Sequence, residues 1–453
     1  MGMRHTLLAV SLTLVLSGCA SQYTGDFSEN AQLNTGKGVN WQAMPAEADS
    51  VTSLTELVSV PGLPALIDEA LSGNPGLQQQ LISLKTAKAQ KSVTNASRLP
   101  GVSAGLNGTR QQDSDDSFNA SLTVSWEADI WNKLGNQVSA AQWSVAASEA
   151  ELTSVTNTLV AEVMRGYLEV AYYQQLIDNE QARLTLLKNN QEVILKRYRT
   201  GLGALEDLDN ARTSSATSEA NIAAYKENLA QSLRALAVLL GRTDMSVSDL
   251  PVAAAFPDVL LPLTSLPEQD LARRPDLMAA YANIQAQEFS TRVAYKSLLP
   301  SISLSAALSD TGTSPSQALF TNPVWQLLGQ LTAPLFQGGE LRANIDIQEL
   351  AVENSWWGYQ STLLTAVKEV QDGIGQEKSL ASQYQATSVA LANAKRSSDT
   401  YTKQYRQGLV DILDLLSVYQ QTYDLQAQLL QLQFNQLSNR ISLGLALGLG
   451  VSA

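Results

Sequence analysis

The sequence predicts a duplicated α+β membrane protein, in which each half joins a pair of membrane-length β-strands to very long helices. Three observations favour this fold class. Short motifs recur about 200 residues apart, apolar and polar residues alternate over stretches of 10 to 13 residues, and a Pro-free stretch of 67 residues follows the first alternating pair. Alternation is typical of strands with one apolar face, and the Pro-free stretch is typical of a helix.

The composition removes several classes of function. The chain has 453 residues, with 30 Lys and Arg against 43 Asp and Glu, and its formal net charge is −13. A nucleic-acid-binding protein needs a basic face, so no nucleic-acid partner is expected. The only His is His5 and the only Cys is Cys19, which excludes Ser-His-Asp and Cys-His catalysis and the usual zinc sites elsewhere in the chain. No catalytic residue, metal site or cofactor is predicted, and a hydrolase that uses carboxylates alone is a distant alternative.

The N-terminus has the pattern of a lipoprotein signal over residues 1–18. Arg4 precedes the apolar stretch 6–16, which is too short for a transmembrane helix and typical of a secretory signal. The Leu-Ser-Gly-Cys tetrad that ends at Cys19 resembles a bacterial lipoprotein box. We therefore expect cleavage before Cys19 and its acylation, which would anchor the chain in membrane lipid; an ordinary signal with a chance Cys is the alternative. Residues 19–60 are expected to form an extended N-terminal segment.

An internal duplication sets the domain organisation. The recurring motifs are Asn74-Pro75 with Arg274-Pro275, Leu99-Pro100 with Leu299-Pro300, and Tyr198–Leu202 with Tyr405–Leu409. Their order is the same in both halves. The sequence therefore predicts repeat 1 over residues 61–250 and repeat 2 over residues 268–453, with a linker over 251–267 that contains four prolines.

Each repeat is expected to begin with a helix whose first residue is Pro75 or Pro275, because the missing N–H of proline has no partner in a first turn. Two strands follow in each repeat. We expect them at 102–113 and 118–130 in repeat 1 and at 301–310 and 324–336 in repeat 2. Such lengths are typical of tilted strands that cross a membrane, whereas most strands of soluble domains have about five or six residues. A soluble β-domain is the alternative.

Long helices complete each repeat, and we expect them at 133–200 and 203–241 in repeat 1 and at 340–407 and 409–448 in repeat 2. Within the first of them, Val163, Val170, Ile177 and Leu184 recur every seven residues, a spacing that indicates coiled-coil packing. Gly201 and Gly408 are expected to form the turns between paired helices. A helix of 67 residues is about 100 Å long, and the two shorter helices of each repeat together match that length.

Four strands are too few to close a membrane barrel, since single-chain barrels begin at about eight strands. An open sheet in lipid would leave the N–H and C=O groups of its edges without partners. The strands of several copies must therefore share one barrel. Two copies give eight strands, whose inward side chains fill the interior, and three copies give twelve strands and room for a lumen.

Seven motifs resemble the TolC-type bacterial outer-membrane efflux ducts, in particular their lipoprotein branch. They are Gly73–Leu77, Leu99-Pro100, Trp126–Trp131, Arg273–Leu277, Leu299–Leu304, Ala333–Gly339 and Gly408–Leu415. The resemblance implies a homotrimer with a twelve-stranded barrel in the outer membrane, four strands from each chain, continuous with a coiled-coil α-helical barrel in the periplasm. It also implies a periplasmic adaptor and an inner-membrane pump, of the RND type in this branch, as partners.

The resemblance further implies that the chain is not an enzyme but a passive exit duct for small molecules, such as drugs and toxic compounds. A type I protein-secretion duct and a structural coiled-coil lipoprotein without a pore are the alternatives. The structural lipoprotein predicts no strands of membrane length, so the strands distinguish it from both ducts.

Two acidic residues, Asp411 and Asp414, are the candidate gate. They follow the turn at Gly408, and a spacing of three residues places both on one face of a helix. In a trimer they would form two rings of three carboxylates, which attract cations and repel anions. The resemblance places them where paired aspartates narrow the periplasmic mouth, and Leu413 would add an apolar constriction. The alternative is that both are ordinary acids that stabilise a helix N-terminus.

The resemblance also implies latch positions near the gate, at Ser417 and Gln420. Many lipoprotein relatives carry an Asp and an Arg where this chain has Ser417 and Gln420, so the chain departs from an Asp–Arg latch there. Arg406 lies next to the turn and is a candidate for a third latch position or for contacting the adaptor; the alternative is an ordinary solvated charge.

Overall fold

A computed structural model describes residues 25–35, 53–58, 60–250, 256 and 273–451. These residues form two units. Unit 1 holds residues 25–35, 81–151 and 276–363, and unit 2 holds residues 53–58, 60–80, 152–250, 256, 273–275 and 364–451. The expected signal, the lipidation site Cys19, most of the segment 19–60 and nearly all of the linker lie outside the described residues.

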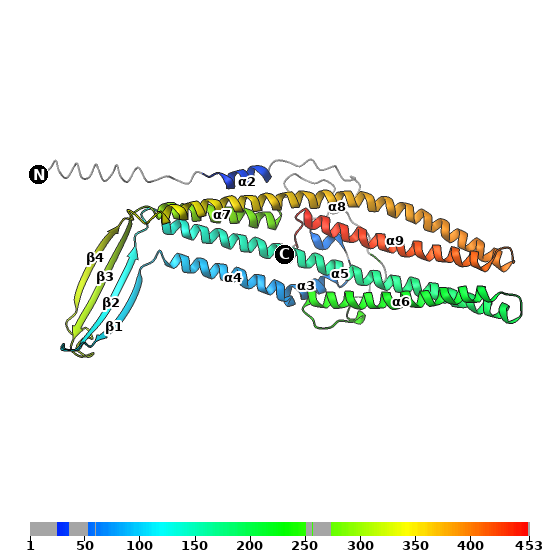
Figure 1. The fold of residues 1–453 in the computed structure, drawn as a ribbon, viewed down its shortest axis with the longest axis horizontal. Coiled ribbons are helices and arrows are strands. Elements are labelled where there is room, and N and C mark those ends of the chain that lie inside the picture. Colours follow the sequence, from blue (N-terminus) through cyan, green and yellow to red (C-terminus); the bar gives the residue numbers. More distant parts are fainter. Residues whose placement is uncertain (1–24, 36–52, 59, 251–255, 257–272, 452–453) are drawn as a thin grey trace. The chain divides into compact units, whose positions relative to one another are not determined.

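Unit 1 contains a four-stranded antiparallel sheet in the order β1-β2-β3-β4 (Figure 1). The strands are β1 (Gly101–Thr109), β2 (Ser117–Glu127), β3 (Ser301–Gly312) and β4 (Val324–Thr332). Their lengths of 9 to 12 residues match those of tilted membrane strands. β1 and β2 form one hairpin, β3 and β4 form another, and β2 pairs with β3 to join the two hairpins. The outer strands β1 and β4 are exposed at every residue.

The strand ends differ from those expected at 102–113, 118–130, 301–310 and 324–336. β1 ends at Thr109, because the chain turns before β2 with Asp113 in the left-handed region at a φ of 63°. β2 ends at Glu127, because Asp129 turns to accept the N–H groups of Leu134 and Gly135 at 3.0 and 2.7 Å. β4 ends at Thr332, since Pro334 has no N–H for a ladder. Only β3 is longer than expected, by two residues.

The helices have a similar order in the two halves of the chain. Residues 61–250 contain α3 (Leu63–Gly73), α4 (Pro75–Ala96), α5 (Lys133–Arg199) and α6 (Leu205–Leu240). Residues 268–453 contain α7 (Pro275–Lys296), α8 (Glu340–Arg406) and α9 (Ile412–Ala446), without a counterpart of α3 among the described residues. The return helices α6 and α9 begin two and three residues later than expected, because Ala204 and Asp411 are N-cap residues with extended backbone. In the part of the chain that the structure describes, no helix has a stretch both apolar and long enough to span a bilayer.

The ends of the shorter helices meet within unit 2, as their lengths predict. Asn74, just before α4, donates its side-chain N–H to the carbonyl of Leu239 in α6 at 2.9 Å. In repeat 2, Arg274, just before α7, donates to the carbonyl of Ala446 in α9 at 3.0 Å. In both cases, a side chain just before the start of one short helix binds a carbonyl in the last turn of another.

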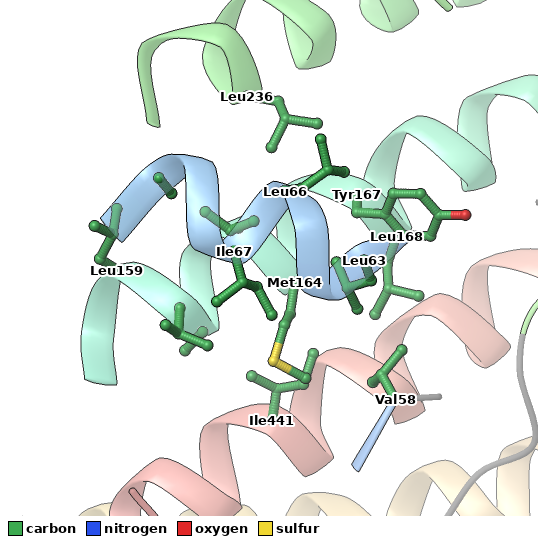
Figure 2. Packing of buried hydrophobic residues seen from close by; sticks show 14 of the residues in the cluster. Val58, Leu63, Leu66, Ile67, Leu159, Met164, Tyr167, Leu168, Leu236 and Ile441 are labelled. Atoms are coloured by element: carbon green, nitrogen blue, oxygen red, sulfur yellow. The ribbon is translucent and has the colours of Figure 1, made fainter. Parts of the chain in front are cut away.

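The core of unit 2 surrounds α3, a helix that the sequence analysis did not predict. Ile67 lies beside Met164 of α5, with Leu236 of α6 and Ile441 of α9 on opposite sides of the cluster (Figure 2). Of the heptad residues, Val163 and Val170 are buried in this cluster, Ile177 is buried and Leu184 is half-buried. Three of the four residues of the period-seven face of α5 are therefore buried. Burying a side chain of this size stabilises the fold by about 1.5–3 kcal/mol.

A short N-terminal helix, α2 (Phe27–Thr35), lies in the segment that was expected to be extended, so that expectation is wrong for these residues. Its first turn binds Glu288 of α7, a carboxylate with 2% exposure. The backbone N–H and the hydroxyl of Ser28 each donate to Glu288 at 3.0 Å. Tyr359 of α8 donates its hydroxyl to the carbonyl of Ala31 at 3.0 Å. These bonds fix α2 to the helices of unit 1. Neither the alternation of polar and apolar residues nor a seven-residue period indicates such contacts in the sequence.

Candidate functional site

The candidate gate lies at the turn between α8 and α9 in unit 2. Gly408 has a φ of 76°, which glycine adopts without strain. Around it, the N–H of Leu409 donates to the carbonyl of Gln404 at 2.9 Å, and the N–H of Gly408 donates to that of Tyr405 at 3.0 Å. This pattern is the Schellman motif, which satisfies the last carbonyls of α8 and reverses the chain. The turn at Gly201 has the same two bonds.

Asp411 is the N-cap of α9, and its side chain accepts the N–H of Ile412. Asp414 lies in the first turn of the same helix. Both acids therefore stabilise the helix start through the cap and the helix dipole, as the alternative interpretation predicts. That role does not use up either carboxylate, because both side chains are exposed. Each has oxygen atoms left to act on ions or on neighbouring subunits.

Asp414 lies on an exposed face of α9, whereas Asp411 is the N-cap with extended backbone and precedes the helix. The expectation that both acids share one helix face is therefore wrong for Asp411. Leu413, Asp414, Ser417 and Gln420 are all exposed, whereas the opposite face carries the buried residues Ile412, Leu415, Leu416 and Tyr419. These pack with Leu187 and Ile194 of α5 and with Leu208 and Ala211 of α6 in a second core cluster. The cluster fixes the rotation of α9 about its axis, so Leu413, Asp414, Ser417 and Gln420 face away from the cluster together.

The first repeat does not reproduce this acidic cap. Its return helix α6 begins after Ala204, which has no side-chain cap, at the position that Asp411 occupies in repeat 2. Glu206 stands at the position of Leu413, and Asp207 at the position of Asp414. The two turns share a backbone motif but differ in charge, so only the second one combines an acidic cap, an exposed apolar residue and an acid in the first turn.

Of the three latch positions, Ser417 and Gln420 lie on the gate face, and Arg406 is exposed in the last turn of α8. The structure brings Ser417 and Gln420 together with Asp414 on one helix face. It does not place Arg406 in that row, because Arg406 precedes the turn.

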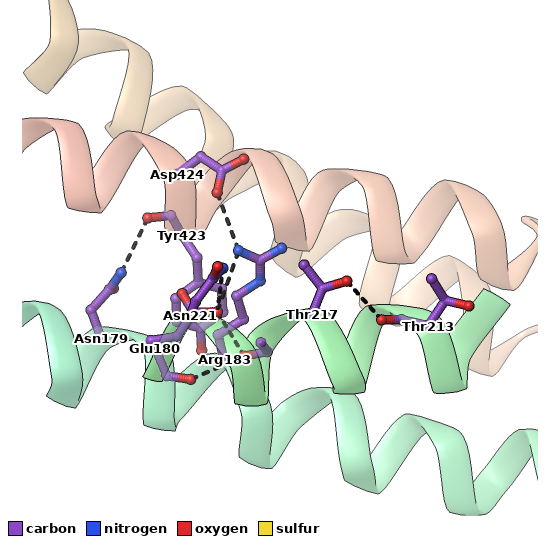
Figure 3. A network of polar contacts seen from close by, with 9 residues as sticks. Asn179, Glu180, Arg183, Thr213, Thr217, Asn221, Tyr423 and Asp424 are labelled. Atoms are coloured by element: carbon purple, nitrogen blue, oxygen red, sulfur yellow. Dashed lines mark hydrogen bonds and ion pairs between the residues drawn. The ribbon is translucent and has the colours of Figure 1, made fainter. Parts of the chain in front are cut away.

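A polar brace joins α5, α6 and α9 (Figure 3). Its residue in α9, Asp424, lies about three helical turns beyond Asp414. The sequence analysis did not predict this brace. Arg183 Nη1 lies 3.3 Å from Asp424 Oδ1 and 3.6 Å from Glu180 Oε1. Glu180 accepts the hydroxyl of Ser218 in α6 at 2.7 Å. Asn179 donates to the carbonyl of Tyr423 at 3.2 Å. Glu180 and Arg183 are both buried on α5. The ion pair that joins the two helical hairpins is the one from Arg183 to Asp424 of α9, whose side chain is 57% exposed.

The brace also changes the ionisation of nearby phenols. Burial raises the pKa of Tyr225, and the Glu180 carboxylate raises it further. Burial is likewise the main cause of the raised pKa of Tyr423. Both phenols therefore stay neutral at physiological pH, and the charges of the brace reside in the carboxylates and the guanidinium. The only sequence signal was a Glu and an Arg three residues apart on a predominantly apolar helix face.

Within the described residues, no group of three or more His, Cys, Asp or Glu side chains is placed to hold a metal ion. Asp411 and Asp414 form a pair in one chain, and any larger acidic group would have to combine several chains.

The chain belongs to the outer membrane efflux protein family, whose sequence model matches residues 66–242 and 266–449. It is 30% identical over 403 residues to the cation efflux system protein CusC of Escherichia coli O6:H1, covering 85% of each chain. It is 27% identical over 462 residues to the probable outer membrane lipoprotein SilC of Salmonella typhimurium, covering 98% of each. A crystal structure of a membrane protein from Pseudomonas aeruginosa has the same fold, with a TM-score of 0.83 at 22% identity over 91% of this chain and all of that chain.

These comparisons confirm the family and the function predicted from the sequence. The protein is an outer-membrane channel of an efflux system, and it resides in the outer membrane. The family model and these relatives are efflux proteins of the outer membrane.

Proposed function

We propose that three copies of this chain form a passive exit duct whose barrel combines four strands from each copy. The observation that carries the proposal is the sheet itself, which has membrane-length strands and two exposed edges. A bilayer offers no hydrogen-bond partner to an open edge. Three sheets in a ring remove all the edges and leave a lumen, whereas two would be filled by side chains. The membrane-length strands also argue against a structural coiled-coil lipoprotein.

Asp411 and Asp414 form the charged constriction of this duct, with Leu413 between them. The exposed face of α9 supports this role, because three copies around one axis would bring six carboxylates together at the end of the helical hairpins. Such a ring favours cations and disfavours anions. The opposite face of α9 is held by the second core cluster, so the constriction can widen only when the hairpins move.

The duct works with a periplasmic adaptor and an inner-membrane pump of the RND type, and acylated Cys19 anchors it in outer-membrane lipid. Its relatives include a cation efflux system protein, a toluene efflux pump outer membrane protein and a pyoverdine export outer membrane protein, and these three cargoes have little chemistry in common. We therefore infer that the pump selects the cargo and that this chain passes small molecules without a specific binding site.

Electrical recording from purified protein in planar bilayers tests the proposal. The expected result is a channel of uniform conductance that prefers potassium over chloride. A boiled sample of the same preparation is the control for detergent leakage. Protein that inserts but never conducts ions would refute the duct.

A further inference from the structure

The two repeats correspond residue by residue, with one change of offset. Pro75 and Pro100 precede their counterparts Pro275 and Pro300 by 200 residues. After the first strand the offset is 207, and the backbone shows it. Four pairs of residues 207 apart have left-handed φ angles in both members: Asp113 and Phe320, Asn132 and Gly339, Gly201 and Gly408, and Gly241 and Gly448. Thus β1 corresponds to β3 at an offset of 200, and β2 corresponds to β4 at an offset of 207.

The hairpin registers agree with these offsets. Gly101 faces Ser125 in the first hairpin, and Ser301 faces Thr332 in the second. Gly101 and Ser301 are 200 residues apart, whereas Ser125 and Thr332 are 207 apart. Inside the chain, the contact between hairpins is the β2–β3 pair, in which Ser125 faces Ser305 and Thr123 faces Ala307. This pair is a template for any contact that continues the same sheet.

We propose that the exposed edge of β4 pairs with β1 of a second copy in the register of the β2–β3 pair. Thr332 then faces Gly105 of the partner subunit, Leu331 faces Leu106 of the partner subunit, and Gln330 faces Asn107 of the partner subunit. The proposal rests on the trimeric duct proposed above, and it adds the residue pairs that join one subunit to the next.

The proposed register also makes the stagger of the sheet uniform, because both contacts between hairpins then use the same pairing. Gly101 of β1 faces Ser125 of β2, and Ser125 in turn faces Ser305 of β3. The counterpart of Gly101 in β3 is Ser301, so the two hairpins are displaced by four residues along the strands. Passing from β3 through Thr332 leads from Ser301 to Gly105 of the partner subunit, again four residues beyond the counterpart. Every hairpin of the ring is thus displaced by the same amount, as a barrel of equivalent hairpins requires for closure.

The chemistry of the edges also fits. Leu331 is placed opposite a leucine and Gln330 opposite an asparagine, so apolar and polar faces continue across the contact. A slip of one residue would place Gln330 opposite the apolar Leu106 of the partner subunit. A slip of two residues would preserve the alternation, so the experiment must separate that register from the proposed one.

The chain beyond β4 supports the same contact. After β2, the N–H of Ala128 donates to the carbonyl of Ile302 at 2.9 Å, which extends the pairing past the strand. The counterparts of this pair are Leu335 and Val102, which are 95% and 67% exposed in the single chain. In the proposed register Leu335 lies against Val102 of the partner subunit, so two large apolar side chains are covered together.

Paired cysteine substitutions test the register, and the background is low because Cys19 is the only natural cysteine. The full-length protein with Gln330→Cys and Asn107→Cys is oxidised in detergent and separated on a non-reducing gel. Side chains directly opposite have Cβ atoms about 4.5–5.5 Å apart, whereas diagonal neighbours are about 7–8 Å apart, beyond the usual reach of a disulfide. We expect covalent subunit ladders from this pair, and several-fold less from Gln330→Cys with Gly105→Cys or with Thr109→Cys.

A matched control lies inside the chain. Thr123→Cys with Ala307→Cys occupies the corresponding positions of the β2–β3 pair and should form a disulfide within one chain. If the cross-link between subunits is strongest with Gly105→Cys or Thr109→Cys, in trimers that still conduct, the proposed register is wrong and the duct stands. If the internal control oxidises while no pair links two subunits and the protein is monomeric, the shared barrel itself is refuted.

Discussion

The double variant Asp411→Asn with Asp414→Asn separates the two roles that the structure gives the gate acids. Asparagine is as good an N-cap as aspartate, so Asp411→Asn keeps the bond to the Ile412 N–H and removes only the charge. Asp411→Ala removes both, and the lost cap costs about 1 kcal/mol per chain. Each chain of a trimer would lose this stabilisation, so the alanine variant destabilises the turn region while the asparagine variant does not.

The assay is the potassium-to-chloride permeability ratio of single channels at two salt concentrations. If the acids line the constriction, the Asn variant lowers the cation preference several-fold in 10 mM salt and much less in 150 mM salt, because the screening length falls from about 30 Å to about 8 Å. Glu206→Gln with Asp207→Asn is the matched control, since it removes the same charge from the turn of repeat 1. An unchanged ratio in the Asn variant at low salt would refute the gate and leave both acids as helix-stabilising residues.

Three further predictions concern the helices. Arg183→Met should lower the free energy of unfolding of unit 2 by about 3–5 kcal/mol, because it leaves Glu180 buried without its cation. Asp424→Asn should lower it by at most about 1 kcal/mol, because the Asp424 side chain is 57% exposed. Equal shifts of the urea unfolding midpoint in the two variants would contradict this order. Glu288→Ala should release the first turn of α2 and speed its cleavage by protease several-fold, and an unchanged cleavage rate would show that the other contacts suffice to hold the helix. Burial raises the pKa of Tyr172 to about 12. The contribution of the neutral phenol to the free energy of unfolding is therefore complete below pH 10 and is lost as the pH rises toward 12. Identical melting temperatures of wild type and Tyr172→Phe across this pH range would argue against the shift.

Sequence patterns predicted the strands and long helices because the periods of two and seven are imposed by burial along extended elements. They also predicted the two glycine turns, where only a residue with free access to positive φ fits. Strand ends were less accurate, because an Asp that caps the next helix or a Pro without an N–H ends a ladder while the alternation continues.

Short elements and buried charges were not predictable in the same way. The helices α2 and α3 have 9 and 11 residues, and α2 is held by polar contacts to Glu288 and Tyr359 that are distant in sequence. The brace at Arg183 joins residues more than 200 positions apart, and nothing local marks its partner. For the gate, the sequence correctly placed Asp411 and Asp414 at the start of a helix. Their role at a pore depends on the symmetry axis of an oligomer, which a single sequence does not encode locally.

The mass of the purified protein in mild detergent tests the central claim most directly, because the four-stranded sheet cannot close alone. The account predicts a particle of three chains, each about 48.7 kDa before processing, after subtraction of bound detergent. A stable particle of one chain, with β1 and β4 both accessible to added thiol reagents at engineered cysteines, would contradict it.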